Sequence, residues 1–137
     1  MTEESRRKNI AAELVRAETA LKAAEALCDL GLHADSVSRS YYAAYHYLRA
    51  LLFSRGMEPR SHSGAIHLFN TEFVRAGLLP SAHNRLLSGM QGSRELADYD
   101  AAAVFAAEDA QAQQDDARTF GRDVVELLRT EGWVGED

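Results

Sequence analysis

Cysteine is almost absent from this chain: Cys28 is the only one among 137 residues. A single thiol cannot form an intramolecular disulfide, which excludes the disulfide-stapled class of small secreted domains. Long apolar runs are missing too, since no stretch approaches the ~20 residues of a membrane span. The first ten residues, MTEESRRKNI, lack the apolar core of a signal peptide. These absences predict a cytoplasmic protein that does not contact a membrane.

Basic residues are too few for one class of partner. Lys and Arg number 15 against 21 Asp and Glu, which gives a net charge of −6. Extended binding along a nucleic-acid backbone requires a surplus of cations. Any contact with RNA must therefore be local, in a cleft where arginines gather against the overall charge.

Motifs for metals, cofactors and covalent catalysis are also missing. His62 and His67 are five residues apart, with no acidic residue at metal-ligand spacing. No glycine-rich loop resembles a phosphate cradle, and no Ser, Cys or Asp lies in a nucleophile motif. The sequence predicts neither a metal nor a cofactor.

Proline is scarce and alanine abundant, which favours helices. Residues 1–8 are polar and are expected to be frayed, whereas apolar residues at helical spacing continue from residue 10 onward. We predict one all-α domain over residues 1–137, with a core at about 10–130, folded as an up-down bundle of four long helices and one short helix. The expected boundaries are Gly31 for the first helix, Asp35 or Ser36 to Gly56 for the second, Ser63 to Gly77 for the short third, Pro80 or Ser81 to Tyr99 and Asp100 for the fourth, and Gly132 for the last.

The helix expected over residues 35–55 has large side chains on two opposite faces, as a central helix does. One stripe, at about 100° per residue, holds Val37, Tyr41, Ala44, Leu48 and Leu51. The other mixes cations with aromatic side chains, a composition that suits a ligand or partner better than a sealed core. It contains Arg39, Tyr42, His46, Arg49 and Phe53.

Arg94 is the clearest single anomaly, because it lies where the pattern of His83, Leu87 and Met90 calls for an apolar residue. A guanidinium at such a position must be paired, reach outward or line a cavity. A structural interpretation pairs it with Asp98, four residues on. A functional one makes Arg94, Asp98 and Tyr99 an edge of a polar pocket, in which the arginine holds a phosphate with two hydrogen bonds.

His46 is a candidate for proton transfer, because its ordinary pKa of about 6.5 suits chemistry at neutral pH. Arg39 lies seven residues earlier, about 10.5 Å along the helix, so the two could meet only across a ligand such as a phosphate. Tyr42 could stack on a base, and His62, in the segment SHSG, could enter a pocket or cap the next helix. The alternative is that His46 bonds a neighbouring carbonyl, Arg39 pairs with an acid, and the tyrosines serve packing.

Three segments together resemble the HEPN family of small helical domains: SRSYYAAYHYLRALLFSRG, SHSGAIHLF and RELADYD. The resemblance covers roughly residues 10–130. It implies a bundle similar to the C-terminal domain of kanamycin nucleotidyltransferase, and a homodimer. It also implies that the gene is paired with one for a minimal nucleotidyltransferase, and that the two proteins act as a toxin and an antitoxin.

Catalytic members of that family resemble metal-independent ribonucleases, with an arginine followed four to six residues later by a histidine. Arg94 matches the arginine, but Tyr99 and Asp100 stand where the histidine is expected. Tyr99 resembles a tyrosine that a partner nucleotidyltransferase modifies with AMP in some pairs.

The main hypothesis is therefore a HEPN bundle that works with a nucleotidyltransferase and binds nucleotide or RNA phosphate with a degenerate ribonuclease motif. Arg39, Tyr42, His62, Asp98 and Tyr99 would form the binding site, with Arg94 and His46 in the catalytic positions. One alternative is an active metal-independent endoribonuclease toxin that uses Arg94 and His46. The other is an interaction module that binds no ligand.

Overall fold

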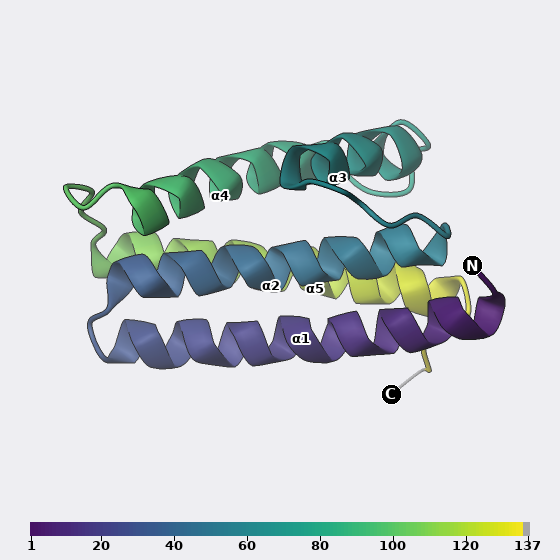
Figure 1. Cartoon of the computed structure of the whole chain (residues 1–137), viewed down its shortest axis with the longest axis horizontal. Helices are drawn as coiled ribbons and strands as arrows, with labels where there is room; N and C mark the ends of the chain where they lie inside the picture. The colour runs from purple at the N-terminus through teal and green to yellow at the C-terminus, as the bar shows by residue number, and fades with distance from the viewer. Residues whose placement is uncertain (136–137) are drawn as a thin grey trace.

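The structure is a computed structural model that describes residues 1–135, and every regular element in that part of the chain is helical (Figure 1). This confirms the all-α prediction, with four long helices and a short one that continues into a single π-helical turn. The elements are α1 (Glu3–Asp29), α2 (His33–Ser54), α3 (His62–Phe69), the π turn η1 (Asn70–Val74), α4 (Ala82–Tyr99) and α5 (Ala107–Thr130).

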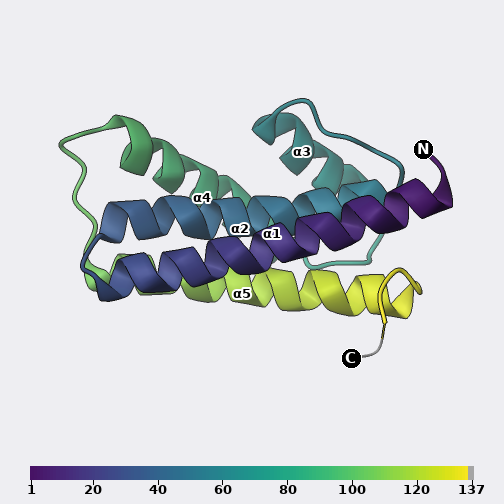
Figure 2. The same ribbon diagram turned by 60° about the horizontal axis from the view of Figure 1, so that its bottom comes forward.

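Helix α2 is the central element, as its two-faced pattern predicted. It packs against α1, α5, α4 and α3, and the two views agree that it runs between α1 on one side and α3 with α4 on the other (Figures 1 and 2). The predicted apolar stripe is fully buried, from Val37 to Leu51. On the opposite face Arg39 is exposed and Tyr42, His46 and Arg49 are half-buried, whereas Phe53 belongs to the core.

The prediction that residues 1–8 are frayed was wrong. Helix α1 begins at Glu3, because the Thr2 side chain accepts the Ser5 N–H at 3.0 Å and caps the first turn. Arg7 anchors this end to the last turn of the molecule: it donates to the Gly132 carbonyl at 2.9 Å and lies 5.0 Å from the Trp133 ring centre. The N-terminal turns are therefore held by a tail that is 125 residues away in sequence.

Two predicted helix starts need correction. Helix α2 begins at His33, so neither Asp35 nor Ser36 caps it; the buried Ser36 hydroxyl instead donates to the Ala24 carbonyl of α1 at 2.7 Å. Helix α3 begins at His62, one residue early, because the Ser61 side chain accepts the Gly64 N–H. The predicted stops are confirmed, each with positive φ: Gly31, Gly56, Gly77 and Gly132.

Glycine has a separate role inside α5, where Gly121 faces the Tyr47 ring of α2. A Cβ at this position would lie 2.3 Å from a ring carbon of Tyr47. The two helices can therefore approach here only because the side chain is absent.

Within residues 1–135, none of the helices combines the length and the apolar character that a membrane-spanning segment needs.

Candidate functional site

Arg94 lies in the buried row of α4, as predicted, with only 8% of its surface exposed. Its guanidinium carbon is 5.4 Å from the ring centre of Tyr41 and 5.9 Å from those of Tyr42 and Tyr99. Its Nη1 lies 3.6 Å from an Asp98 carboxylate oxygen, so the predicted ion pair is present. The arginine is thus held mainly by aromatic faces, at positions where a cation is attracted to the ring.

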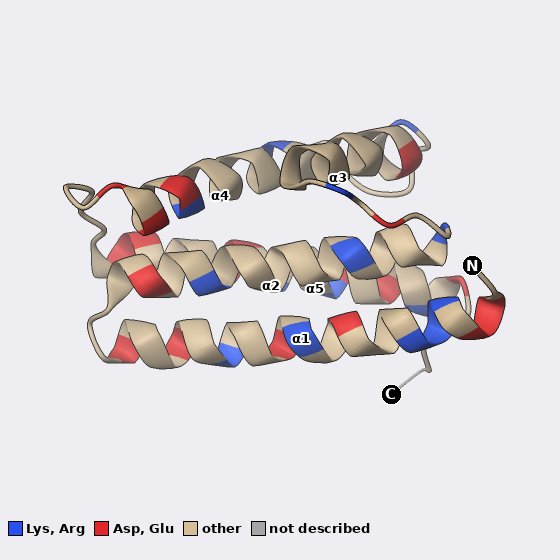
Figure 3. Cartoon of the chain, in the orientation of Figure 1, with Lys and Arg blue, Asp and Glu red and all other residues tan. Residues whose placement is uncertain are grey.

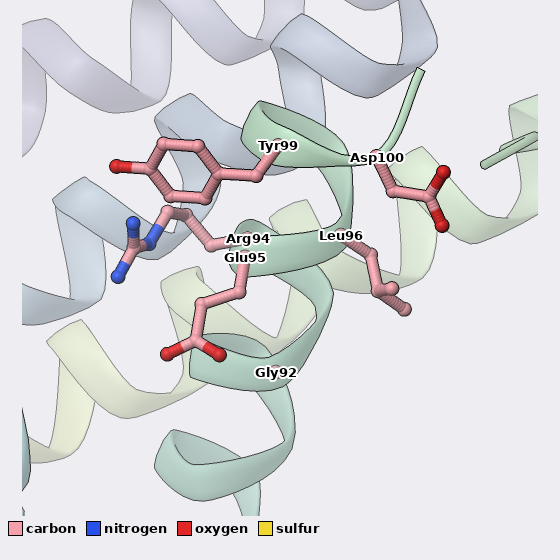
Figure 4. Close-up of a pocket in the computed structure, with 6 residues that line it drawn as sticks. All are labelled: Gly92, Arg94, Glu95, Leu96, Tyr99 and Asp100. Atoms are coloured by element: carbon pink, nitrogen blue, oxygen red, sulfur yellow. The ribbon is translucent and has the colours of Figure 1, made fainter. Parts of the chain in front are cut away.

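Beside Arg94 lies an open hollow of about 650 Å³ at the end of α4. Figure 4 shows that Arg94, Glu95 and Tyr99 project to one side of the helix, whereas Leu96 and Asp100 project to the other. Arg94 also has a buried Nε–H without a hydrogen-bond partner in the described part of the chain. Such a group costs free energy unless something satisfies it. Capacity to donate to a ligand lies instead with the guanidinium Nη atoms, whose contact with Asp98, at 3.6 Å, is longer than a hydrogen bond.

His62, from the start of α3, meets the same tyrosines. A hydrogen bond of 2.5 Å joins its Nδ1 to the Tyr41 hydroxyl, and its ring stacks 4.2 Å from that of Tyr45. Burial lowers the pKa of His62, and the nearby Arg94 lowers it further. His62 is therefore neutral at pH 7, and its Nδ1 is engaged with Tyr41.

Arg39 completes this group, because its guanidinium lies 4.6 Å from the Tyr42 ring centre. The structure thus brings together predicted site residues from three segments that are far apart in sequence. Arginines beside an exposed aromatic residue, here Tyr99, can bind phosphate and stack on bases. We call this group the Arg94 cluster; it consists of Arg39, Tyr41, Tyr42, His62, Arg94, Asp98 and Tyr99.

His46 lies outside the Arg94 cluster. Its Nδ1 is 2.6 Å from one carboxylate oxygen of Glu13 in α1, and Arg49 Nε donates to the other at 2.9 Å. Burial alone would raise the pKa of Glu13, but the hydrogen bonds from His46 and Arg49 outweigh it and lower that pKa. Because an ionised carboxylate only accepts, Nδ1 of His46 carries the proton in this contact.

His46 and Arg94 line different hollows. The hollow at His46 has a volume of about 530 Å³ and lies between α1 and α2. We call it the α1–α2 hollow; its lining residues are Ala12, Glu13, Arg16, Tyr42, Tyr45, His46 and Arg49. Tyr42 belongs to both sites, since it also contacts Arg94 and Arg39. The proposed catalytic pair is therefore divided between two neighbouring sites.

Sequence reasoning missed Glu13, the residue that fixes His46. The sequence held one sign of it: Glu13 is an acidic residue three positions after Ile10, at the edge of the apolar row of the first helix. Its partners lie 33 and 36 residues away, and no local pattern connects positions at that separation. Tyr45, which stacks on His62, was not among the predicted site residues.

Comparison with known proteins shows which family model and which relatives match this chain. A family model described as the HEPN domain matches residues 11–130. A protein of Methanocaldococcus jannaschii named "Putative toxin" is 36% identical over 93 residues, which cover 68% of this chain and 69% of that protein. A UPF0332 protein of Gloeobacter violaceus is 44% identical over 84 residues, which cover 61% and 67%. A second M. jannaschii protein with the same toxin name is 31% identical over 96 residues, which cover 70% and 65%.

Proposed function

This chain belongs to the HEPN domain family, and we propose that it is a toxin-like member that binds RNA on the Arg94 cluster. The toxin names of two relatives support the class. The ligand is inferred from this chain's own side chains. RNA combines phosphates, which arginine binds, with bases, which aromatic rings stack on.

The observation that carries this proposal is the position of Arg94 among three tyrosines that come from two helices. Tyr99 is 79% exposed, so its ring can be reached by a base and can stack on it. Arg39 adds a second, exposed cation beside Tyr42. Such a site is local, which agrees with a chain whose overall charge of −6 excludes extended backbone binding.

We infer that this member binds RNA without cutting it. Tyr99 and Asp100 occupy the place of the motif histidine after Arg94, and His46 is held in the separate α1–α2 hollow. The proposed partner is a minimal nucleotidyltransferase, with which the chain, as a homodimer, forms a toxin–antitoxin-like pair. Because Tyr99 is exposed, we propose its hydroxyl as the group to which such an enzyme would transfer AMP from ATP, with release of pyrophosphate.

RNA binding is tested by fluorescence anisotropy with a short single-stranded RNA that lacks terminal phosphates. We expect Arg94→Gln to weaken binding at least five-fold, because it removes the cation that the tyrosines hold. Tyr99→Ala provides a second variant whose side chain is exposed, so that its loss leaves the core intact. Arg85→Gln, an exposed arginine at the other end of α4, is the matched control.

Affinity equal to that of Arg85→Gln in both variants would contradict the proposal and favour an interaction module without a ligand. The nucleotidyltransferase pairing is tested separately, by incubating the chain with such an enzyme and ATP. A mass increase of one AMP group that is absent in Tyr99→Phe supports the pairing.

One observation favours an active endoribonuclease as a second candidate. The Glu13 carboxylate fixes the tautomer of His46, and leaves its Nε2 as a base in an open hollow. Incubation of the purified chain with structured RNA in EDTA tests this candidate. Cleavage that is lost in His46→Ala would establish it over binding alone.

A further inference from the structure

One end of the bundle exposes a group of apolar side chains. The turn between α1 and α2 and the loop between α4 and α5 both lie at this end (Figures 1 and 2), and Cys28 of α1 lines one hollow with Ala107 of α5. Val104 is 91% exposed, Leu30 73% and Leu32 47%. An exposed apolar patch of this kind marks an interaction surface. We call it the apolar tip; it consists of Leu30, Leu32, Ala101, Ala102, Val104, Ala106 and Ala107, all of them exposed.

The loop that carries Val104 is held by hydrogen bonds on both sides. Asp100 accepts the Ala102 N–H at 2.9 Å through its side chain and the Ala103 N–H at 3.1 Å through its carbonyl. On the other side, the Asp109 carboxylate accepts the Ala106 N–H at 2.8 Å. Val104 is therefore presented by an ordered loop, which lowers the entropy that a partner loses on binding.

The apolar tip is surrounded by negative charge. Acidic residues mark the ends of α1 and α4 and the starts of α2 and α5 (Figure 3). Segments 28–36 and 98–112 contain six acidic residues and no lysine or arginine. The nearest cations along the chain, Arg39 and Arg94, lie beside the Tyr42 ring, and counting both still leaves a surplus of four negative charges.

Three of these acids have no cation to neutralise them. Asp29, Asp35 and Glu108 are exposed and make no ion pair within residues 1–135. They flank the apolar tip from α1, α2 and α5. An apolar centre with a charged rim is the usual anatomy of a protein–protein interface.

The rim also decides between the possible occupants of the apolar tip. A two-fold contact with a second copy of the chain would set the same patch against itself, and so would oppose acid to acid. An anionic membrane surface or a nucleic-acid backbone would be repelled for the same reason. A polypeptide with lysine or arginine beside its apolar side chains complements both the centre and the rim.

We propose that the apolar tip is a docking surface for a cationic amphipathic segment of another protein. Apolar side chains of that segment cover Leu30, Leu32 and Val104, and its cations pair with Asp29, Asp35 and Glu108. The hollow of about 440 Å³ between α1 and α5, which Glu108 also lines, receives one of its side chains. This surface goes beyond RNA binding on the Arg94 cluster and stands even if that cluster binds nothing.

The test uses two model helical peptides of equal length, which share one pattern of leucines and carry either lysine or glutamate at all other positions. Each is titrated into the full chain at physiological salt and followed by ¹H–¹⁵N NMR. We expect the lysine peptide to bind at least ten-fold more tightly than the glutamate peptide. The largest shifts should be at Leu30, Leu32, Val104 and Ala107.

Two variants separate the apolar and the charged contributions. Val104→Ser should weaken binding of the lysine peptide at least five-fold, whereas the control Val15→Ser, at a 63% exposed position on α1, should keep wild-type affinity. The pair Asp29→Asn with Glu108→Gln should weaken it at least three-fold. The control pair Glu4→Gln with Glu18→Gln removes the same charge from exposed positions elsewhere on α1 and should have less effect.

Equal affinity of Val104→Ser and Val15→Ser for the lysine peptide would overturn the proposal, because the attraction would then be that of any acidic chain for a cation. Equal binding of the two peptides, or no binding of either, would overturn it as well. Light scattering examines a second copy: an assembly of the wild type that dissociates in Val104→Ser would assign the apolar tip to self-association instead. Sedimentation with phosphatidylcholine vesicles that is lost in Val104→Ser would assign it to a membrane.

Discussion

The Nδ1 of His62 lies 2.5 Å from the hydroxyl of Tyr41, which ties the start of α3 to the central helix. Burial, assisted by Arg94, lowers the pKa of this histidine in the folded chain. The unfolded chain therefore binds a proton at His62 more readily than the folded chain does. As pH falls from about 6.5 through the lowered pKa, the folded state loses stability relative to the unfolded state.

The first prediction follows from this loss of stability as His62 becomes protonated. The free energy of unfolding should fall between pH 7.5 and pH 5, and His62→Gln should make this fall smaller, because the titrating group is gone. Urea denaturation at several pH values measures it. His67→Gln, an exposed histidine of the same helix, is the control and should follow the wild type. Equal pH slopes in His62→Gln and His67→Gln would contradict the prediction.

The second prediction concerns Glu13, which accepts from both His46 and Arg49. Glu13→Gln removes the charge and leaves two half-buried donors with a neutral partner. We expect a loss of about 1–3 kcal/mol in the free energy of unfolding. Glu18→Gln, an exposed acid on the same helix, should change it by less than about 0.5 kcal/mol. Chemical denaturation at pH 7 compares the two variants, and equal stability would show that the contact contributes nothing.

A third prediction uses two glycines in helices with opposite surroundings. A Cβ at Gly121 would meet the Tyr47 ring at 2.3 Å, whereas Gly89 has nothing within 4 Å. Gly121→Ala should therefore destabilise the fold by about 1–3 kcal/mol through overpacking. Gly89→Ala should stabilise it by about 0.5–1 kcal/mol, because alanine favours a helix. Thermal unfolding of both variants checks the difference in sign; a stabilised Gly121→Ala would contradict the account of the α2–α5 contact.

Much of the fold could be predicted from local sequence, because helices are specified by nearby residues. Apolar spacing gave the central position of α2, and glycines at positive φ ended the helices where expected. The N-terminal prediction failed for two reasons: the local cap at Thr2 was overlooked, and Arg7 is anchored at Gly132 and Trp133. A contact between residues so far apart leaves no mark on the pattern of residues 1–8.

The candidate site, like the fold, was predictable only where the signal lies within a single helix. Arg94 stood out because a cation in an apolar row needs an explanation within one helix. The division between Arg94 and His46 could not be foreseen, since it depends on Glu13 and on how α1 packs against α2. Spacing along one helix shows which residues share a face, but not which side chain from another helix engages them.

The central claim is that Arg94 and Tyr42 act as one binding unit for RNA, and a double-mutant cycle tests it most directly. RNA affinity is measured by anisotropy for the wild type, Arg94→Gln, Tyr42→Leu and the double variant. We predict that the double variant binds only slightly more weakly than the worse single variant, with a coupling energy above about 0.5 kcal/mol. Losses in the two single variants that add fully in the double variant, or no loss in either, would contradict the claim.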